Sequence, residues 1–320
     1  MEKAVIERKV ETKQHILHPG EMMCKEEYIQ KRNRYEASRI CNLSHRTRLA
    51  MYPVLWLALT TMNALNGFHC TSLSNCKLPR TDKPTIFCIT HIGKHDIEIC
   101  AQVLKKHFYL LSGDFENLHG TFDGTFIELN GIVYLNKYIR EDKAKSKQTC
   151  VRVLKSGGNI MWFPEGVWNL SPNQPVLHLP FGIIEVAQKA NAAIIPVAIE
   201  QYGKEFFVNI GEVFDVAPYC RKYPSDVQQK LAAIADLRDI MATLKWDIWA
   251  SKKPWNRKDM PENVFDQFVN ERLKEWHGFT YEDVRAREFN PKGGVNEREA
   301  FAHLTHLNPS RENAFLLRER

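Results

Sequence analysis

Two short segments carry the residues of this chain whose types and spacing could perform chemistry. Residues 91–96 read HIGKHD, and residues 163–166, farther along the chain, read FPEG. Each segment directly follows an apolar run that is typical of a buried strand. In the first, His91 stands five positions before Asp96, so the pair could act as a general base and the carboxylate that orients its ring. In the second, Glu165 is an acidic residue in a tight turn.

The spacing between His91 and Asp96 restricts where the two residues can meet. Five residues along an ideal helix turn by about 140°, so the side chains cannot face each other in mid-helix. They can meet if His91 lies in the turn after the strand and Asp96 lies in the first turn of the following helix, where an acidic side chain is favoured. Histidine suits the removal of a hydroxyl proton because its ordinary pKa, roughly 6.5, is close to neutrality. The sequence therefore predicts a general base at a strand-to-helix junction.

Simpler interpretations of these residues stay open at this point. His91 could be a hydrogen-bonded loop histidine with Asp96 as a helix cap, and Glu165 could be a solvated residue in a strand-end turn. His91 and His95, four positions apart, could also bind a metal together with Asp96. However, no glutamate follows His91 as in H-E-x-x-H, and no third, distant ligand is evident in the sequence. We therefore expect no metal.

Short apolar runs alternate with amphipathic segments through the middle of the chain. We expect strands at 85–90, 108–111, 132–135, 159–163 and 193–199, and a long strand or a strand pair at 205–216. We expect helices at 97–106, 142–155, 183–191 and 228–250, and a glycine-punctuated loop between residues 111 and 132. This alternation predicts an α/β fold with a mixed, largely parallel sheet flanked by helices. The carboxyl ends of neighbouring strands would then bring the two segments into one site.

The N-terminal part of the chain, residues 1–68, combines a basic stretch with an apolar helix. Residues 49–68 carry no charge, and this length could just span a bilayer. Residues that interrupt an apolar helix recur on one helical stripe of this segment: Pro53, Thr60, Asn63 and Gly67. A broad apolar face, a polar stripe and a preceding basic run favour a helix that lies in the membrane interface. A helix buried against the core and a helix that spans the bilayer are the alternatives.

Composition places the chain among ordinary folded proteins. Of its 320 residues, 44% are hydrophobic and 26% are charged, and the formal net charge is +6. The basic residues are dispersed and no recognised binding module is present, so we expect no nucleic-acid partner. Eight cysteines without a C-x-x-C pair favour a reducing cytosolic compartment. We expect three parts: the basic and apolar segment 1–68, a catalytic domain at 69–250, and a helical C-terminal extension at 251–320.

Two further segments complete an ordered set of motifs. Residues 131–137 read GIVYLNK, and residues 194–198 read IIPVA. The four segments of this chain resemble the lysophosphatidate (1-acylglycerol-3-phosphate) O-acyltransferase family, the PlsC-type glycerolipid acyltransferases. In that family the motifs H-x-x-x-x-D, G-x-x-x-x-x-R, F-P-E-G and apolar-Pro-apolar occur in the same order. The resemblance covers roughly residues 40–245. Each motif alone is weak, but the ordered set is a strong indication.

The resemblance implies transfer of a fatty acyl group from acyl-CoA or acyl-carrier protein to the hydroxyl of a lysophospholipid, with no metal or prosthetic group. It implies that His91 is the general base and that Asp96 is its partner. Glu165 and Gly166 would orient the polar head of the acceptor, and Lys137 would bind its phosphate. The full set of substrate-binding residues that the resemblance implies is Gly131, Lys137, Phe163, Pro164, Glu165, Gly166 and Pro196, the last shaping the floor of the site.

The chain departs from the family pattern in its cations. Val167 and Trp168 stand where the family often has Thr-Arg, and residues 112–115 lack a lysine that relatives often carry. Lys137 replaces an arginine, which keeps the charge but loses the bidentate fork that suits phosphate; Arg140 could compensate. Two alternatives therefore remain, an acyltransferase for a non-phosphate acceptor and a non-catalytic lipid-binding protein on the same fold. The expected location is the cytoplasm, in peripheral association with the cytoplasmic face of a membrane.

Overall fold

The computed structural model describes residues 25–73, 77–171, 174–251, 264–276 and 278–287. The chain forms two compact units, Met1–Asn42 and Leu43–Arg320. In the first unit, helix α2 (Lys25–Glu36) buries the rings of Tyr28 and Tyr35. The boundaries expected near residues 68 and 250 stay predictions. Every residue expected to perform chemistry belongs to the second unit.

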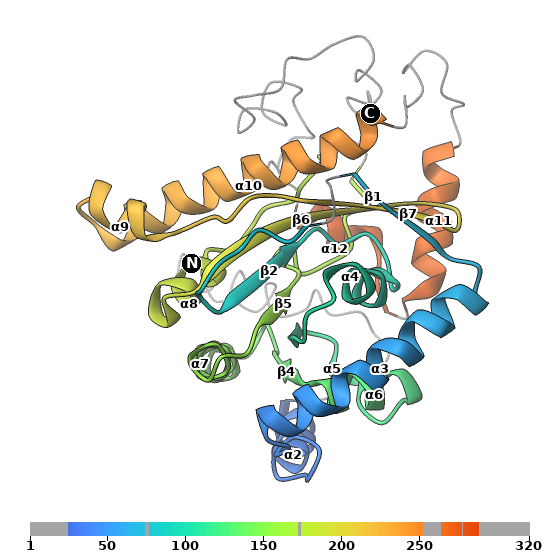
Figure 1. Ribbon diagram of the computed structural model, residues 1–320, viewed down its shortest axis with the longest axis horizontal. Helices are drawn as coiled ribbons and strands as arrows, with labels where there is room; N and C mark the ends of the chain where they lie inside the picture. The colour runs from blue at the N-terminus through green and yellow to red at the C-terminus, as the bar shows by residue number, and fades with distance from the viewer. Residues whose placement is uncertain (1–24, 74–76, 172–173, 252–263, 277, 288–320) are drawn as a thin grey trace, which may run out of the picture. The chain divides into compact units, whose positions relative to one another are not determined.

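The second unit is built on a seven-stranded sheet in the order β1-β7-β6-β2-β5-β3-β4 (Figure 1). Its strands are β1 (His69–Ser72), β2 (Thr85–Ile89), β3 (Tyr109–Ser112), β4 (Ile132–Tyr134), β5 (Ile160–Trp162), β6 (Ala193–Tyr202) and β7 (Glu205–Ile210). Neighbouring strands are parallel except β6 and β7, which are antiparallel. The strands from β6 to β4 therefore point the same way, and their carboxyl ends share one edge of the sheet. The expected mixed, largely parallel α/β fold is confirmed.

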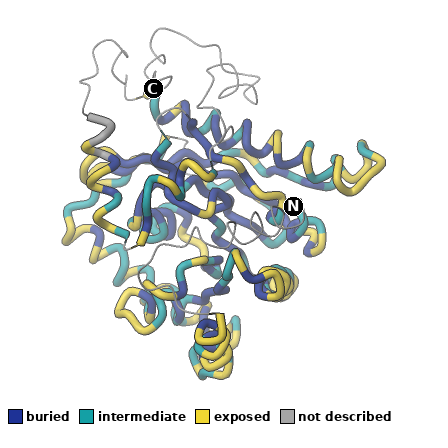
Figure 2. Tube along the Cα trace, turned by 180° about the vertical axis from the view of Figure 1, so that it is seen from behind, coloured by how far each residue is buried: buried dark blue, intermediate teal, exposed yellow. Residues whose placement is uncertain are grey.

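Strand β2 is buried over its whole length because it has a neighbour on each side. Ile86 lies opposite Ile160 of β5 and Ile194 of β6, and the burial pattern of β2 is continuous. Figure 2 shows the strands of the sheet as the buried interior of this unit. A parallel strand that is covered on both faces reads as an unbroken apolar run, which is why the sequence indicated it clearly.

Helices cover both faces of the sheet (Figure 1). On one face lie α7 (Arg140–Lys155), α8 (Gly182–Ala190) and α10 (Asp226–Ser251), with α8 in contact with both of the others. On the other face lie α3 (His45–Leu65), α4 (Asp96–Leu104) and α6 (Phe122–Asn130), with α3 in contact with both of the others. Four further helices of the described part are α5 (Phe115–Leu118), α9 (Ala217–Lys222), α11 (Val264–Glu275) and α12 (Tyr281–Arg285).

Two expectations about secondary structure were wrong. The segment between β3 and β4 is not a loop, because α5 and α6 form there with the side chains of Asp114 and Thr121 as their N-caps. Residues 205–216 form neither one long strand nor a pair of strands, since β7 ends at Ile210 and Phe214 rejoins the sheet only as an isolated bridge with Ile194. The short edge strand β1 and the helix α9 were not expected from the sequence.

Helix α3 buries two polar side chains, those of Arg48 and Asn63, and exposes several apolar ones. Asn63, which belongs to the polar stripe, is 2% exposed and donates from Nδ2 to Oε1 of Gln102 at 2.9 Å. Arg48 is also 2% exposed and donates to carbonyl oxygens at the end of α6. The most exposed apolar side chains of the helix are Val54 at 71%, Leu57 at 61% and Leu65 at 82%. Among the described residues, no helix has both the length and the apolar character needed to cross a membrane.

Candidate active site

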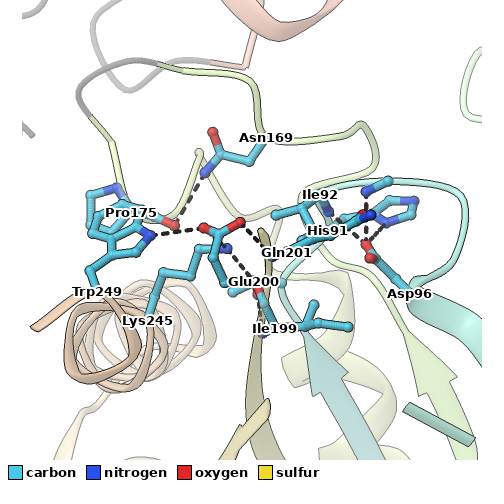
Figure 3. Close-up of polar contacts among 12 residues, drawn as sticks. His91, Ile92, Asp96, Asn169, Pro175, Ile199, Glu200, Gln201, Lys245 and Trp249 are labelled. Carbon is cyan, nitrogen blue, oxygen red and sulfur yellow. Dashed lines mark hydrogen bonds and ion pairs between the residues drawn. The ribbon is translucent and has the colours of Figure 1, made fainter. Parts of the chain in front are cut away.

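The junction between β2 and α4 brings His91 and Asp96 together. His91 lies in the turn after β2, and Asp96 is the first residue of α4. The Asp96 side chain reaches back to the turn, and its Oδ2 lies 2.8 Å from Nδ1 of His91 (Figure 3). The same oxygen accepts hydrogen bonds from the backbone N–H groups of Ile92 at 2.6 Å and Gly93 at 3.1 Å. This is the arrangement of strand, turn and helix start that the spacing of the two residues predicted.

The bond to Asp96 fixes the protonation of the His91 ring. Asp96 is 0% exposed, so protein donors rather than bulk water surround its Oδ2. A carboxylate accepts hydrogen bonds, so Nδ1 of His91 carries a proton and Nε2 presents a lone pair. No hydrogen-bond partner of Nε2 lies among the residues that the structure describes. The ring is therefore arranged as a proton acceptor at Nε2.

Aromatic side chains from the loop after β5 pack against the His91 ring. Phe163 stacks on the imidazole with ring centroids 4.3 Å apart, and Trp168 meets it edge-on at 6.1 Å. The His91 side chain is 15% exposed, so part of the ring stays accessible. These contacts exclude water from most of the ring and leave the remainder open to a substrate.

Glu165 joins the two expected segments through a buried carboxylate. The residue is 0% exposed, its Oε1 accepts from the backbone N–H of His91 at 3.1 Å, and its Oε2 accepts from that of Leu177 at 2.9 Å. Burial raises the pKa of the Glu165 carboxyl, while these two hydrogen bonds and the positive charge of Lys245 act in the opposite direction. The interpretation of Glu165 as a solvated turn residue is therefore wrong.

The carbonyl group of His91 is held by the same loop. Asn169 donates from its backbone N–H to the carbonyl oxygen of His91 at 2.6 Å. The Asn169 side chain donates to the carbonyl oxygens of Gln174 and Pro175 at 3.0 and 3.2 Å (Figure 3). Both backbone polar groups of His91 are thus bonded to residues that follow β5, so the histidine is fixed by its main chain as well as by its side chain.

A buried ion pair, which no sequence motif indicated, lies close to this loop. Lys245 of α10 pairs with Glu200 of β6 at 2.9 Å, and their side chains are 2% and 10% exposed. Nε1 of Trp249 donates to the same carboxylate at 2.8 Å (Figure 3). Two features of the sequence could have indicated this ion pair: Lys245 stands among apolar residues of its helix, and Glu200 follows an apolar run in its strand. The charge of Lys245 also favours the ionised form of Glu165.

Two expected residues lie apart from the strand ends that carry His91. Gly131 precedes β4 and therefore lies at the amino ends of the parallel strands. Its φ of 126°, and the Tyr109 ring 2.5 Å from where a β-carbon would be, account for a glycine at this position. Pro196 lies within β6, opposite Cys88 of β2. A role in substrate binding stays a prediction for both residues.

Lys137 and Gly166 lie at the same edge of the sheet as His91. Lys137 follows β4, and burial together with the positive charge of Arg287 lowers the pKa of its ammonium group. Gly166 follows Glu165 directly and has a φ of 70°, which favours glycine. Pro164 is buried in the same turn. The structure therefore brings the FPEG turn next to the His91 turn, whereas Lys137 lies in the turn that follows the outer strand β4.

His95 has its own set of partners. Its Nδ1 lies 2.5 Å from Oε1 of Glu98, and its ring packs against Phe68 and Phe206. The side chains of His91 and His95 are therefore bonded to different acids. Within the described ranges, no group of three or more histidine, cysteine, aspartate or glutamate residues could hold a metal ion.

The fold and the site define an α/β protein with a histidine–aspartate pair at the carboxyl edge of its sheet. The family model described as Acyltransferase matches residues 26–200, which is more than half of the 320-residue chain. The chain therefore belongs to the acyltransferase family, and the expected family and class of enzyme are confirmed.

Individual relatives are more distant. The chain is 27% identical over 154 residues to a 1-acyl-sn-glycerol-3-phosphate acyltransferase from Chlamydomonas reinhardtii, covering 48% of this chain and 44% of that protein. It is 26% identical over 200 residues to an uncharacterized acyltransferase from Schizosaccharomyces pombe, covering 58% and 71%. The crystal structure of the 1-acyl-sn-glycerophosphate acyltransferase PlsC from Thermotoga maritima aligns with a TM-score of 0.49 and 16% identity, covering 71% and 90%. The match thus spans less than half the length of the Chlamydomonas relative.

Proposed function

We propose that this protein is an O-acyltransferase that moves a fatty acyl group from an acyl thioester to the hydroxyl of a lysophospholipid. The observation that carries the proposal is the 2.8 Å bond between Nδ1 of His91 and the buried Asp96, because it leaves Nε2 able to accept a proton. Membership of the acyltransferase family supports the reaction class. The name of the Chlamydomonas relative supports a lysophospholipid acceptor. The donor is acyl-CoA or acyl-carrier protein.

The proposed reaction uses His91 twice. Nε2 of His91 removes the proton of the acceptor hydroxyl as the hydroxyl oxygen attacks the carbonyl carbon of the thioester. Asp96 stabilises the imidazolium that forms. When the tetrahedral intermediate collapses, the C–S bond breaks and the imidazolium returns the proton to the leaving thiolate. The products are a new ester and a free thiol, and His91 is neutral again.

In this proposal Glu165 positions the base and does not contact the acceptor. Both of its oxygens are engaged by backbone N–H groups, those of His91 and Leu177, and the residue is 0% exposed. An acceptor head group could reach this carboxylate only by displacing those donors, which would leave buried N–H groups unpaired. The turn that it holds is the one that presents the His91 ring.

We also propose that α3 lies on a membrane surface, from which a lipid acceptor could enter the site. The exposed apolar side chains of Val54, Leu57 and Leu65 would be buried there, and each buried side chain of this size contributes about 1.5–3 kcal/mol. The polar residue Asn63 is buried instead, the reverse of what a helix in water shows. The exposed Arg46 near the start of α3 suits anionic head groups.

Thiol release from purified protein tests the proposed reaction. The donors are long-chain acyl-CoA and, separately, acyl-carrier protein, and the acceptors are lysophosphatidate, other lyso-lipids and simple alcohols. We expect release that requires an acceptor and that falls by about 10²–10⁴-fold in His91→Ala, while circular dichroism shows an unchanged fold. Full activity of His91→Ala would disprove the proposed role of this residue. Release that no acceptor stimulates with either donor would favour a non-catalytic lipid-binding protein.

A further inference from the structure

The guanidinium group of Arg238 binds the main chain of a buried segment beyond the FPEG turn. Arg238 belongs to α10 and is 4% exposed. Its Nη2 donates to the carbonyl oxygen of Val176 at 2.7 Å, and its Nε donates to that of Leu177 at 3.1 Å. Val176 and Leu177 are fully buried, so their carbonyl groups depend on protein donors. One planar side chain thus ties α10 to two consecutive backbone carbonyls.

A single peptide group lies between Arg238 and Glu165. The carbonyl oxygen of Val176 and the N–H of Leu177 belong to this group. The oxygen accepts from Arg238, and the N–H donates to Oε2 of Glu165 at 2.9 Å. A trans peptide group directs its C=O and N–H to opposite sides, so the cation and the carboxylate stand at its two ends. A cation at the oxygen makes the N–H a better donor, because hydrogen bonds in a series polarise one another.

The other oxygen of Glu165 connects this peptide group to the proposed base. Oε1 of Glu165 accepts from the backbone N–H of His91 at 3.1 Å. A continuous series of hydrogen bonds therefore runs from Arg238 to the main chain of His91. Asp96 binds the ring of His91, whereas this series fixes the backbone that carries the ring.

The two ends of the series are opposite charges held in the interior. Burial lowers the pKa of Arg238 to about 10, while the charge of Glu165 acts in the opposite direction, so the guanidinium is protonated at neutral pH. The positive charge of Lys245 also favours the ionised form of Glu165. Lys245 follows Arg238 by seven residues, which places both cations on one face of α10. Loss of Arg238 would remove a donor from two buried carbonyls and a cation from the surroundings of a buried carboxylate.

We propose that Arg238 positions His91 for proton transfer by holding Glu165 in place through this peptide group. The inference rests on the proposed acyl transfer, to which it adds a residue that lies outside every motif of the sequence. Arg238 touches no reacting atom, so it is a positioning residue. Arginine suits this role because Nε and Nη2 reach two carbonyl oxygens at once, whereas the single ammonium group of lysine lacks this fork.

A double-mutant cycle on kcat tests the role of Arg238. Thiol release from acyl-CoA with a short-chain lysophosphatidate is measured for Arg238→Gln, Glu165→Gln and the double variant. We expect Arg238→Gln alone to lower kcat by about 10–100-fold with little change in KM, because a displaced base slows the chemical step. In the Glu165→Gln background the same substitution should lower kcat by less than about 3-fold, because the series is already broken. Losses of kcat that multiply in full would overturn the proposal.

Arg48→Gln is the matched control. Arg48 is 2% exposed, and its Nη1 donates to the carbonyl oxygens of Glu128 and Leu129 at 2.6 and 2.7 Å. It is therefore also a buried arginine that binds two consecutive carbonyls, but it is outside the series that reaches Glu165. Its substitution should lower the free energy of unfolding and change kcat by the same factor with and without Glu165→Gln.

Arg238→Lys provides a second variant that keeps the charge and loses the fork. Its kcat should lie between those of the wild type and Arg238→Gln, and its loss should also shrink in the Glu165→Gln background. This variant completes the cycle if Arg238→Gln does not fold. A full loss of kcat that is independent of Glu165 would contradict the proposal here as well.

Amide hydrogen exchange measures the same series without turnover. The backbone N–H groups of His91 and Leu177 are followed in the wild type, Arg238→Gln, Arg238→Lys and Arg48→Gln. We expect both groups to exchange about 10-fold faster or more in Arg238→Gln and to exchange at the wild-type rate in Arg48→Gln. Unchanged exchange of both groups in the folded Arg238 variants would overturn the proposal.

The proposed series and the proposed reaction can fail separately. If the wild type transfers no acyl group but exchange at His91 depends on Arg238, the reaction is wrong and the positioning of His91 stands. If acyl transfer occurs while the losses of kcat multiply and exchange is unchanged, the role of Arg238 is wrong and the reaction stands.

Discussion

The backbone N–H of His91 donates to Oε1 of Glu165 at 3.1 Å, so the proposed base is held by a carboxylate from another strand end. The His91 side chain is held by a second carboxylate, that of Asp96, at 2.8 Å. One acid therefore sets where the histidine stands, and the other sets which ring nitrogen carries the proton. Substitutions of the two acids should have different consequences.

Glu165→Gln should lower both stability and activity. A glutamine keeps one acceptor oxygen but places an amide N–H₂ against a backbone N–H, so one buried donor loses its partner. We expect the free energy of unfolding to fall by about 1–3 kcal/mol and kcat to fall with it, because the His91 turn loosens. Urea unfolding and steady-state kinetics measure the two effects.

Glu128→Gln is the matched control for this prediction. Glu128 is 5% exposed, and its Oε1 accepts from Tyr134 and lies 2.7 Å from Nδ1 of His119, away from the site. It should lose stability with little change in kcat. Equal losses of kcat in both variants would show that Glu165 acts only through overall stability.

Asp96→Asn should lower kcat with little change in KM. An asparagine oxygen can still accept from the turn, but the neutral amide no longer stabilises the imidazolium that forms as His91 takes a proton. We expect a fall in kcat of about 10²–10⁴-fold, measured by thiol release under saturating acceptor. Asp142→Asn is the control, because Asp142 is also a buried acid in the first turn of a helix and accepts from the preceding loop, at the N–H of Asn136. An Asp96→Asn enzyme as active as this control would contradict the proposed pairing.

The parts of the fold that the sequence predicted are those that local patterns determine. The buried runs at β2, β5 and β6 are continuous and apolar, and the spacing of His91 and Asp96 permits one local arrangement in which they meet. The helices α5 and α6 were missed although their N-caps, Asp114 and Thr121, are readable capping residues, because glycines nearby favoured a loop. Local signals thus sufficed for the central strands and conflicted at α5 and α6.

The parts that the sequence did not predict depend on contacts between distant segments. Arg287 follows Gly166 by more than a hundred residues, and no motif links them, yet the guanidinium lies at that turn. Arg272 of α11 likewise lies 3.4 Å from where a β-carbon on Gly93 would be. The packing of Trp168 against the C-terminal helices, together with the hydrogen bond from the N–H of His178 to the carbonyl oxygen of Arg287, brings these cations to the site. A C-terminal segment without a motif was therefore the least readable part of the sequence.

Leu57→Glu should weaken binding of the protein to lipid vesicles. Leu57 of α3 is 61% exposed, and replacing it by a charge removes about 1.5–3 kcal/mol of apolar burial at a membrane surface, which is about 10-fold or more in partitioning. Co-sedimentation with vesicles that contain anionic phospholipid measures the change. Val227→Glu on α10 is the control, because Val227 is 62% exposed and outside α3. Equal binding of the two variants would rule out α3 as the contact surface.

His107 should make the stability of the fold depend on pH. It is 4% exposed, its Nε2–H donates to the carbonyl oxygen of Asn130 at 2.8 Å, and burial lowers its pKa from 6.5 to about 4. Below about pH 6.5 the unfolded chain binds a proton at this residue and the folded chain does not, so the free energy of unfolding falls as the pH drops toward about 4. From pH 7 to pH 5 this residue alone accounts for a loss of about 2 kcal/mol.

Urea unfolding at pH 7 and pH 5 measures this loss in the wild type and in two variants. His107→Gln keeps a donor for Asn130 but does not titrate. Between pH 7 and pH 5 its free energy of unfolding should therefore fall by about 2 kcal/mol less than that of the wild type. His69→Gln, at an exposed position on β1, should keep the pH dependence of the wild type. If His107→Gln and the wild type lose the same free energy on acidification, protons are taken up elsewhere on unfolding and His107 is not held neutral by its burial.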